Sequence, residues 1–200
     1  PDGGTGVLMA LGGGLGGWVR RWLIEPAGPV EPLPDLSLPT AEGPFVWMRI
    51  GAGYEKTGPD EVSLPPALIQ LLVQMRRRGL QIAVSRAVGG PADIGTRGVS
   101  SIADAALSPA EAGAHLDAMQ PAAVLLIGPD LPRPLIEAAE ARDIPVILAE
   151  ARLSTPRSGW SLSRLRRRSP LTQLSLLLLP DLASCDTALD LGAADERIDR

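Results

Sequence analysis

The chain has 200 residues, of which 45% are hydrophobic and 21% are charged, and its formal net charge is −4. This composition is typical of one globular domain with a substantial core, and it excludes a disordered chain or a long membrane protein. The single cysteine, Cys185, excludes an internal disulfide framework, and the sequence shows no signal peptide with a cleavage region. We therefore expect a protein of a reducing, cytoplasmic compartment.

Residues 1–43 are predicted to form a glycine- and proline-rich leader and linker. The apolar run before Arg20 is shorter than the roughly 20 residues that a membrane-spanning helix requires. Trp18 and Trp22 beside arginines favour a short interfacial anchor, and a loose leader packed on the domain is the alternative. Residues 12–17 match the G-x-G-x-x-G pattern of dinucleotide-binding loops, but a proline-rich linker stands where the second strand should follow, which argues against such a site.

Strand and helix patterns alternate over the predicted domain, residues 44–200. Ser108, Pro109 and Glu111 form a capping-box pattern at the start of one helix, and Gly79 ends another. The predicted strands are 45–50, 81–85, 103–107, 124–127 and 145–148; the predicted helices are 64–78, 109–119, 134–142 and a segment after 176–179 that carries Cys185. This alternation predicts an α/β fold with a Rossmann-like, mainly parallel sheet flanked by helices.

Residues 123–154 read as a βαβ unit with a ligand-binding edge. The first strand stops at Gly128-Pro129, and the second runs into the polar residues 150–154. Parallel strands linked through a helix have both carboxyl ends on one edge of the sheet, so residues 128–130 and 150–154 should share that edge. Open α/β sheets bind their ligands at this edge, which predicts a binding site there.

The same stretch, from Val124 to Ser154, resembles the acceptor-side domain of the bacterial 3-deoxy-D-manno-octulosonic acid (Kdo) transferases. The strongest piece is I-P-V-I-L-A-E-A-R-L-S at residues 144–154, where the family has I-P-L-V-I-A-N-A-R-L-S. Weaker agreement extends from about residue 44 to residue 198. The resemblance implies a single lobe of a two-lobed GT-B glycosyltransferase that transfers Kdo from CMP-Kdo to a lipid A precursor in lipopolysaccharide synthesis.

The resemblance also implies partners and a location. No cofactor is expected; the donor CMP-Kdo is expected on a second lobe that these 200 residues lack, so the chain alone should be inactive. The expected partners are the lipid A precursor and an anionic membrane surface, not nucleic acid, and the expected location is peripheral, on the cytoplasmic face of the bacterial inner membrane. The sequence does not indicate the oligomeric state.

Two glutamates compete for the role of general base that the resemblance implies. Read forward from the first strand, Glu55 falls at the family's catalytic glutamate, although Tyr54 replaces a glycine of the family. Read back from the following helix, Glu61 falls there, and residues 56–60 are then an insertion. A base must lie within hydrogen-bond reach of the acceptor hydroxyl. The alternative for both is a solvated loop carboxylate, and Glu61 also suits the first turn of a helix.

A second functional block of the family, E-T-E-L-W-P-N, is only partly present. Gly128 stands at its first glutamate, which is thought to stabilise the transition state, and Asp130 keeps an acid two positions later. Asp130 either contacts substrate or caps the following helix. The missing carboxylate at residue 128 predicts slower transfer, and it leaves open a catalytically degenerate Rossmann-like module that binds membrane lipid.

Basic residues near the second strand of the unit are candidates for anion binding. Arg152 and Ser154 in A-R-L-S suit a phosphate or carboxylate of the substrate, and a loop-fixing pair of Arg152 with Glu150 or a nearby acid is the alternative. Arg164, Arg166, Arg167 and Arg168 suit a membrane-facing amphipathic helix or a merely solvated one. His115, the only histidine, and Cys185 lack partners in the sequence pattern for a metal site or a catalytic triad and are predicted to be structural.

Overall fold

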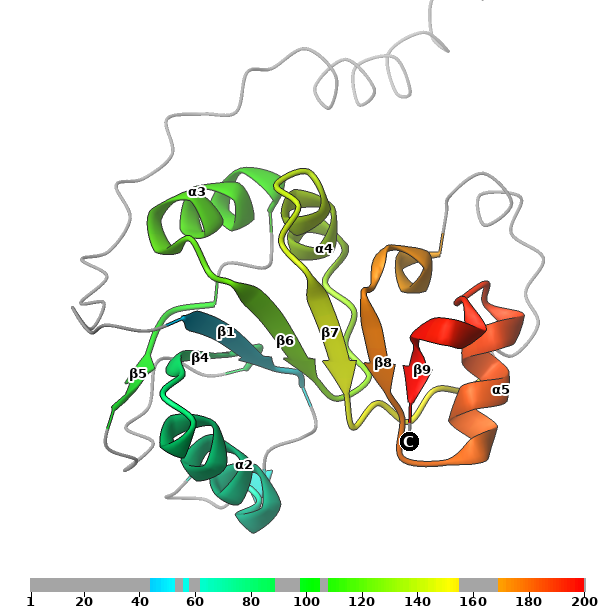
Figure 1. The fold of residues 1–200 in the computed structure, drawn as a ribbon, viewed down its shortest axis with the longest axis horizontal. Helices are drawn as coiled ribbons and strands as arrows, with labels where there is room; N and C mark the ends of the chain where they lie inside the picture. The colour runs from blue at the N-terminus through cyan, green and yellow to red at the C-terminus, as the bar shows by residue number, and fades with distance from the viewer. Residues whose placement is uncertain are drawn as a thin grey trace, which may run out of the picture. The chain divides into compact units, whose positions relative to one another are not determined.

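The computed structural model describes residues 44–52, 56–57, 62–88, 98–104, 108–154 and 169–199. Their main feature is a seven-stranded sheet with the strand order β5-β4-β1-β6-β7-β8-β9, in which every neighbouring pair is parallel (Figure 1). The strands are β1 Phe45–Ile50, β4 Gln81–Arg86, β5 Val99–Ser101, β6 Ala123–Ile127, β7 Val146–Ala149, β8 Leu176–Leu178 and β9 Ile198–Asp199. The predicted α/β fold with a mainly parallel, Rossmann-like sheet is confirmed.

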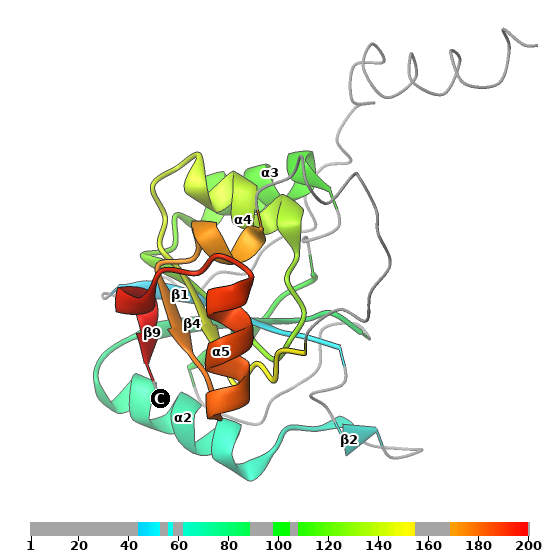
Figure 2. The same cartoon turned by 90° about the vertical axis from the view of Figure 1, so that its right-hand side faces the viewer.

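Helices connect these strands and cover both faces of the sheet. Figure 2 shows α3 and α4 on one side of the sheet and α2 on the other. The helices are α2 Pro66–Arg77, α3 Pro109–Met119, α4 Arg133–Glu140 and α5 Leu182–Asp190, with short 3₁₀ helices η1 Pro170–Gln173 and η2 Asp195–Arg197. A small antiparallel hairpin, β2 Lys56–Thr57 with β3 Val62–Ser63, precedes α2 and was not predicted. No described helix is long and apolar enough to cross a bilayer.

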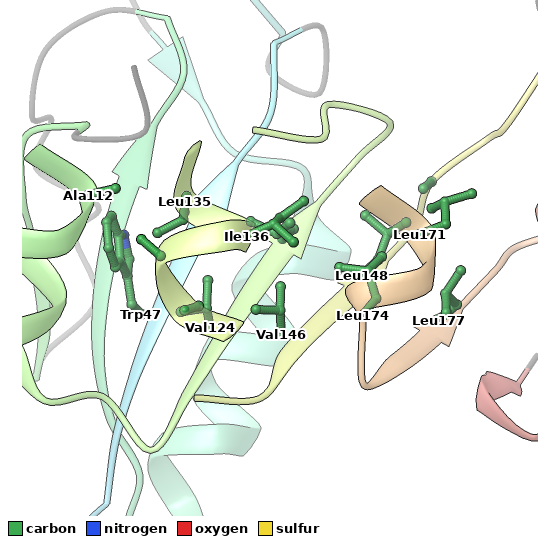
Figure 3. Packing of buried hydrophobic residues seen from close by; sticks show 14 of the residues in the cluster. Trp47, Ala112, Val124, Leu135, Ile136, Val146, Leu148, Leu171, Leu174 and Leu177 are labelled. Carbon is green, nitrogen blue, oxygen red and sulfur yellow. The ribbon is translucent and has the colours of Figure 1, made fainter. Parts of the chain in front are cut away.

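Two hydrophobic clusters, one on each face of the sheet, form the core. Alternate side chains of β1 separate between them: Trp47 joins the cluster with α3 and α4, whereas Met48 and Ile50 join the cluster with α2. Figure 3 shows the first cluster, in which Trp47 lies beside Ala112 of α3. Strands β6 and β7 are apolar on both faces because helices cover both, as expected for a parallel sheet.

Local sequence signals start and end most elements as predicted. Ser108 caps α3 by accepting a hydrogen bond from the Glu111 backbone N–H, with Pro109 at the first helical position. Gly79 follows α2 with φ 84°, a conformation that L side chains rarely adopt. The predicted strand at 103–107 is wrong for residues 103 and 104, which follow β5 at Val99–Ser101, and residues 105–107 lie outside the described residues. The short edge strand carries two serines, so its apolar signal is weaker than that of the residues after it.

His115 lies buried on α3 and packs against the core instead of facing solvent. Its ring stacks on Trp47, with ring centroids 6.1 Å apart and an interplanar angle of 28°. Nδ1 lies 3.1 Å from the Glu111 carbonyl oxygen, and Nε2 is buried without a hydrogen-bond partner in the described part of the chain. The histidine therefore contributes aromatic packing to the core.

Candidate functional site

The strand order places a topological switch point between β1 and β6. From β1 the chain continues through β4 to β5 on one side, then returns to β6 beside β1 and continues through β7 and β8 on the other side (Figure 1). The connection after β1 leads to β4 on one side of this pair, and the connection after β6 leads to β7 on the other side. Doubly wound sheets bind ligands outside the carboxyl ends of the strands at such a point.

A buried arginine lies at this end of β1. The Arg49 Nε donates to Asp104 Oδ1 over 2.9 Å and Nη2 donates to Asp104 Oδ2 over 2.9 Å, while Nη1 donates to Asp130 Oδ2 over 2.7 Å. Asp104 follows β5 and Asp130 follows β6, so one guanidinium joins the ends of three strands. We refer to Arg49, Asp104 and Asp130 as the edge triad.

The edge triad combines one buried cation with two carboxylates. Arg49 is only 4% exposed. Burial lowers the pKa of Arg49, but its hydrogen bonds and charge interactions with Asp104 and Asp130 outweigh this and raise the pKa above the ordinary value. One guanidinium and two carboxylates leave the edge triad itself with one net negative charge. The fork geometry at Asp104 is the strong, charge-assisted kind of contact.

A second network holds Asp104 from the core side. The Trp47 Nε1 donates to Ser85 Oγ over 2.9 Å, and Ser85 Oγ in turn lies 3.4 Å from Asp104 Oδ1. Both Trp47 and Ser85 are fully buried. Asp104 is therefore fixed by hydrogen bonds from β1 and β4 and is the more buried of the two acidic partners of Arg49.

Gly51 lets the loops after β1 and β6 approach closely. Its N–H donates to the Ile127 carbonyl oxygen over 2.8 Å. A Cβ at residue 51 would lie 2.9 Å from Asp130 Cβ and 2.9 Å from the Ile127 oxygen, closer than real Cβ atoms come. Glycine is required here because Asp130 Cβ and the Ile127 carbonyl oxygen fill the space that any side chain would take.

The structure places the predicted edge residues as the βαβ reading requires. β6 and β7 are parallel neighbours, and Gly128 N donates to the Ala149 carbonyl oxygen over 2.9 Å, so residues 128–130 and 150–154 follow strand ends on one edge. Gly128, which stands where the family has a glutamate, has φ 90°, a conformation that suits glycine. The alternative of Asp130 as a helix cap is wrong: Pro132 is the N-cap of α4, no side chain caps it, and the Asp130 carboxylate binds Arg49.

The A-R-L-S segment after β7 runs past α5. Leu153 N donates to Ser184 Oγ over 3.1 Å, which ties the segment to the first turn of α5. Arg152 and Ser154 are exposed, and the charge of Arg152 lowers the pKa of Asp181, after the larger effect of hydrogen bonds from Ser184. The acid that Arg152 influences is therefore Asp181, the N-cap of α5.

Several predicted site residues lie outside the described residues. These are the two candidate bases, Glu55 and Glu61, and the arginines 164, 166, 167 and 168. Within the described ranges, no three His, Cys, Asp or Glu side chains group closely enough to hold a metal ion.

Sequence reasoning missed Arg49 and Asp104. A usable signal was present: Arg49 is the one charged residue in an otherwise apolar strand, F-V-W-M-R-I. A charged side chain in a fully buried strand must find an opposite charge, because an unpaired buried charge is strongly unfavourable. The pattern alone does not say which acid supplies it.

Two solved structures are similar to the chain at low sequence identity. The S. aureus MnaA–UDP complex has a TM-score of 0.50 and 17% identity over 78% of this chain and 43% of that chain. UDP-GlcNAc 2-epimerase from Neisseria meningitidis, bound to UDP-GlcNAc, has a TM-score of 0.49 and 15% identity over 77% of this chain and 45% of that one. The chain thus spans less than half the length of these proteins, and the likeness is one of fold alone.

A family model gives the closer relationship. No curated protein matches the chain. Residues 61–200, which include β4 to β9 and the two aspartates of the edge triad, match the model described as 3-deoxy-D-manno-octulosonic-acid transferase (kdotransferase). The chain therefore belongs to the Kdo transferase family, as a divergent N-terminal domain.

Proposed function

We propose that this chain is the acceptor-binding domain of a glycosyltransferase that transfers Kdo from CMP-Kdo to a lipid A precursor in lipopolysaccharide synthesis. The family match over residues 61–200 carries the proposal. The switch point between β1 and β6 supports it, because that edge is where this class of sheet binds ligands. CMP-Kdo is held mainly by a second lobe outside these residues.

The proposed reaction needs one base on this domain. A hydroxyl oxygen of the acceptor attacks the anomeric carbon of Kdo, the bond from that carbon to the CMP phosphate breaks with its electron pair going to CMP, and a carboxylate takes the hydroxyl proton. Glu55 and Glu61 are the candidates, and the family match begins at Glu61. Asp130, at the switch point, accepts a hydrogen bond from an acceptor hydroxyl.

A transfer assay on the full-length protein tests the base. With labelled CMP-Kdo and a lipid A precursor, replacing the true base by alanine should lower kcat by about a hundredfold or more, and the other glutamate should matter little. Glu137→Ala, on the exposed face of α4, is the matched control. Wild-type activity in both Glu55→Ala and Glu61→Ala would remove both assignments, and no transfer by the wild type would remove the function.

Anion and membrane contacts complete the proposal. Arg152 and Ser154 bind a phosphate or carboxylate of the substrates at the end of β7, and Arg164, Arg166, Arg167 and Arg168 attract the domain to anionic lipid on the cytoplasmic face of the inner membrane. Flotation with vesicles that contain phosphatidylglycerol tests the second part: changing residues 166–168 to serine should weaken binding. Unchanged flotation would reject the basic block as an anchor.

Gly128 favours one second candidate, a lipid-binding domain that has lost catalysis. It provides no carboxylate where the family pattern has one, and a lost electrostatic partner typically slows a reaction by about a hundredfold. This candidate predicts vesicle binding by the full-length protein without any transfer. The variant Gly128→Glu would not distinguish the two candidate functions, because a left-handed φ of 90° strains any side chain at residue 128.

A further inference from the structure

The two carboxylates of the edge triad differ in how much of their hydrogen-bonding capacity is used. The Asp104 side chain is 11% exposed, and both of its oxygens receive hydrogen bonds from Arg49. The Asp130 side chain is 38% exposed and receives one, at Oδ2. No hydrogen bond from a described residue reaches Asp130 Oδ1. A carboxylate has about four acceptor positions, so Asp130 keeps acceptor capacity on its solvent side.

Arg49 and Gly51 together determine the direction of the Asp130 Oδ1 atom. The Gly51 backbone lies against the Asp130 backbone and Cβ, and Arg49 Nη1 holds Oδ2 at 2.7 Å. The side chain is thus held at its base and at one oxygen. Contacts at both ends of the side chain restrict its rotamer and so fix the direction of the second oxygen, whereas an exposed aspartate without such contacts samples several rotamers.

The net charge of the edge triad selects the kind of group that this oxygen accepts. Its single net negative charge disfavours a phosphate or carboxylate and favours a hydrogen-bond donor, whether neutral or cationic. A sugar hydroxyl is a donor of this kind.

We propose that Arg49 is a positioning residue of the acceptor site: through Nη1 it orients the Asp130 carboxylate so that Oδ1 accepts a hydrogen bond from a hydroxyl of the sugar acceptor. The inference rests on the proposed function for the identity of the acceptor. Arg49 is buried and does not touch substrate itself.

A mutant cycle in the full-length protein tests the inference. Lysine at residue 49 keeps the charge but has a single ammonium group that cannot hold both aspartates in the fork geometry. Arg49→Lys and Asp130→Asn should each raise the acceptor KM about tenfold, with a smaller change in kcat. The double variant should be no worse than the more severe single one, because Arg49 acts through Asp130.

Two further variants separate positioning from folding. Arg142→Lys is the matched control, because Arg142 forms a two-pronged contact with Asp117 at 2.7 and 2.8 Å. This pair lies next to the start of β7, away from the carboxyl edge of the sheet. The acceptor KM of Arg142→Lys should therefore stay at the wild-type value. Gly51→Ala displaces Asp130 without a charge change and should raise the acceptor KM as Arg49→Lys does. An unchanged acceptor KM in Arg49→Lys, in a protein that melts like the wild type, would overturn the inference, as would additive effects in the double variant.

A binding measurement separates this inference from the proposed function. The probe is a free glucosamine disaccharide without acyl chains, and its binding is followed by ligand-detected NMR without donor. Weaker binding in Arg49→Lys and Asp130→Asn, with no further loss in the double variant, supports positioning even where the wild type transfers no Kdo. Equal binding by all four proteins, or no binding by the wild type, overturns it.

Discussion

Arg49 and Asp104, 55 residues apart in the chain, form a two-pronged ion pair at the carboxyl edge of the sheet, with both Nε and Nη2 2.9 Å from carboxylate oxygens. The arginine is on β1 and the aspartate follows β5, two strands away in the sheet. The pair therefore ties the loop that leads toward α3 to the centre of the sheet, at the point where ligands are expected.

The first prediction concerns this pair. Asp104→Ala leaves Arg49 buried with Asp130 as its only acid, and removal of one partner of a buried ion pair typically costs about 3 kcal/mol or more. Urea unfolding should show this loss. Asp117→Ala, which breaks the exposed pair with Arg142, is the control and should leave the urea midpoint near the wild-type value, because exposed ion pairs contribute little. Equal losses of stability in Asp104→Ala and Asp117→Ala would contradict the claim that burial makes the Arg49 pair the more important one.

The second prediction contrasts two glycines. Gly51→Ala forces a Cβ against the Ile127 oxygen and the Asp130 Cβ, and it should destabilise the domain by roughly 1–3 kcal/mol. In Gly113→Ala the nearest atom is Arg142 Nη2 at 2.9 Å, the end of a flexible side chain that can move away. Since alanine also favours the interior of α3, Gly113→Ala should be neutral or stabilising by up to about 1 kcal/mol. Thermal unfolding measures both, and a stable Gly51→Ala protein would refute the close approach.

The third prediction concerns a glutamate in the left-handed region. Glu150 has φ 56° directly after β7, where the Kdo transferase pattern has asparagine. Asparagine tolerates this conformation better than glutamate, so Glu150→Asn should stabilise the domain by about 1 kcal/mol. Glu137→Asn, within α4, should instead destabilise slightly because asparagine is a poorer helix former. A lower melting temperature for Glu150→Asn would show that the Glu150 side chain makes a stabilising contact that outweighs the strain.

The fourth prediction is a pH dependence at the start of α5. The Asp181 carboxylate accepts a hydrogen bond from Ser184 N over 2.8 Å, and the hydrogen bonds from Ser184 lower the pKa of Asp181 below the ordinary value of 3.8. Because the folded-state pKa is the lower one, this stabilisation is fully present above the unfolded pKa and is lost as the pH falls through the folded pKa. Asp181→Asn should therefore be less stable than the wild type near neutral pH, and the difference should shrink as the pH falls below the ordinary pKa of 3.8. Urea unfolding of both proteins across this range measures it; a constant difference would contradict the assignment.

Local patterns in the sequence were sufficient for most elements. The Ser108 cap, the glycine after α2 and the apolar runs of β1, β4, β6 and β7 each act over a few residues, so the sequence shows them directly. A strand was expected at 103–107 instead of at β5, because an edge strand buries little and the two serines of β5 give no apolar alternation. The strands of the hairpin before α2 have two residues each, too few for any pattern.

The candidate site was predictable only in part. The βαβ reading placed Asp130 and the A-R-L-S segment on one edge, because a parallel connection through a helix allows no other arrangement. The role of Asp130 was left between capping and binding, since both need the same residue type at the same place. The contact with Arg49, 81 residues earlier, argues against capping, and the contact with substrate stays a prediction.

The sequence by itself determined the alternation of strands and helices, the parallel sheet and the kinship with the Kdo transferases, because these depend on periodicity and on one continuous motif. Tertiary structure alone decided which charges meet. β1 lies inside the sheet between β4 and β6, so its Arg49 receives acids from loops on both sides. The burial that makes such pairing obligatory exists only after the sheet has assembled.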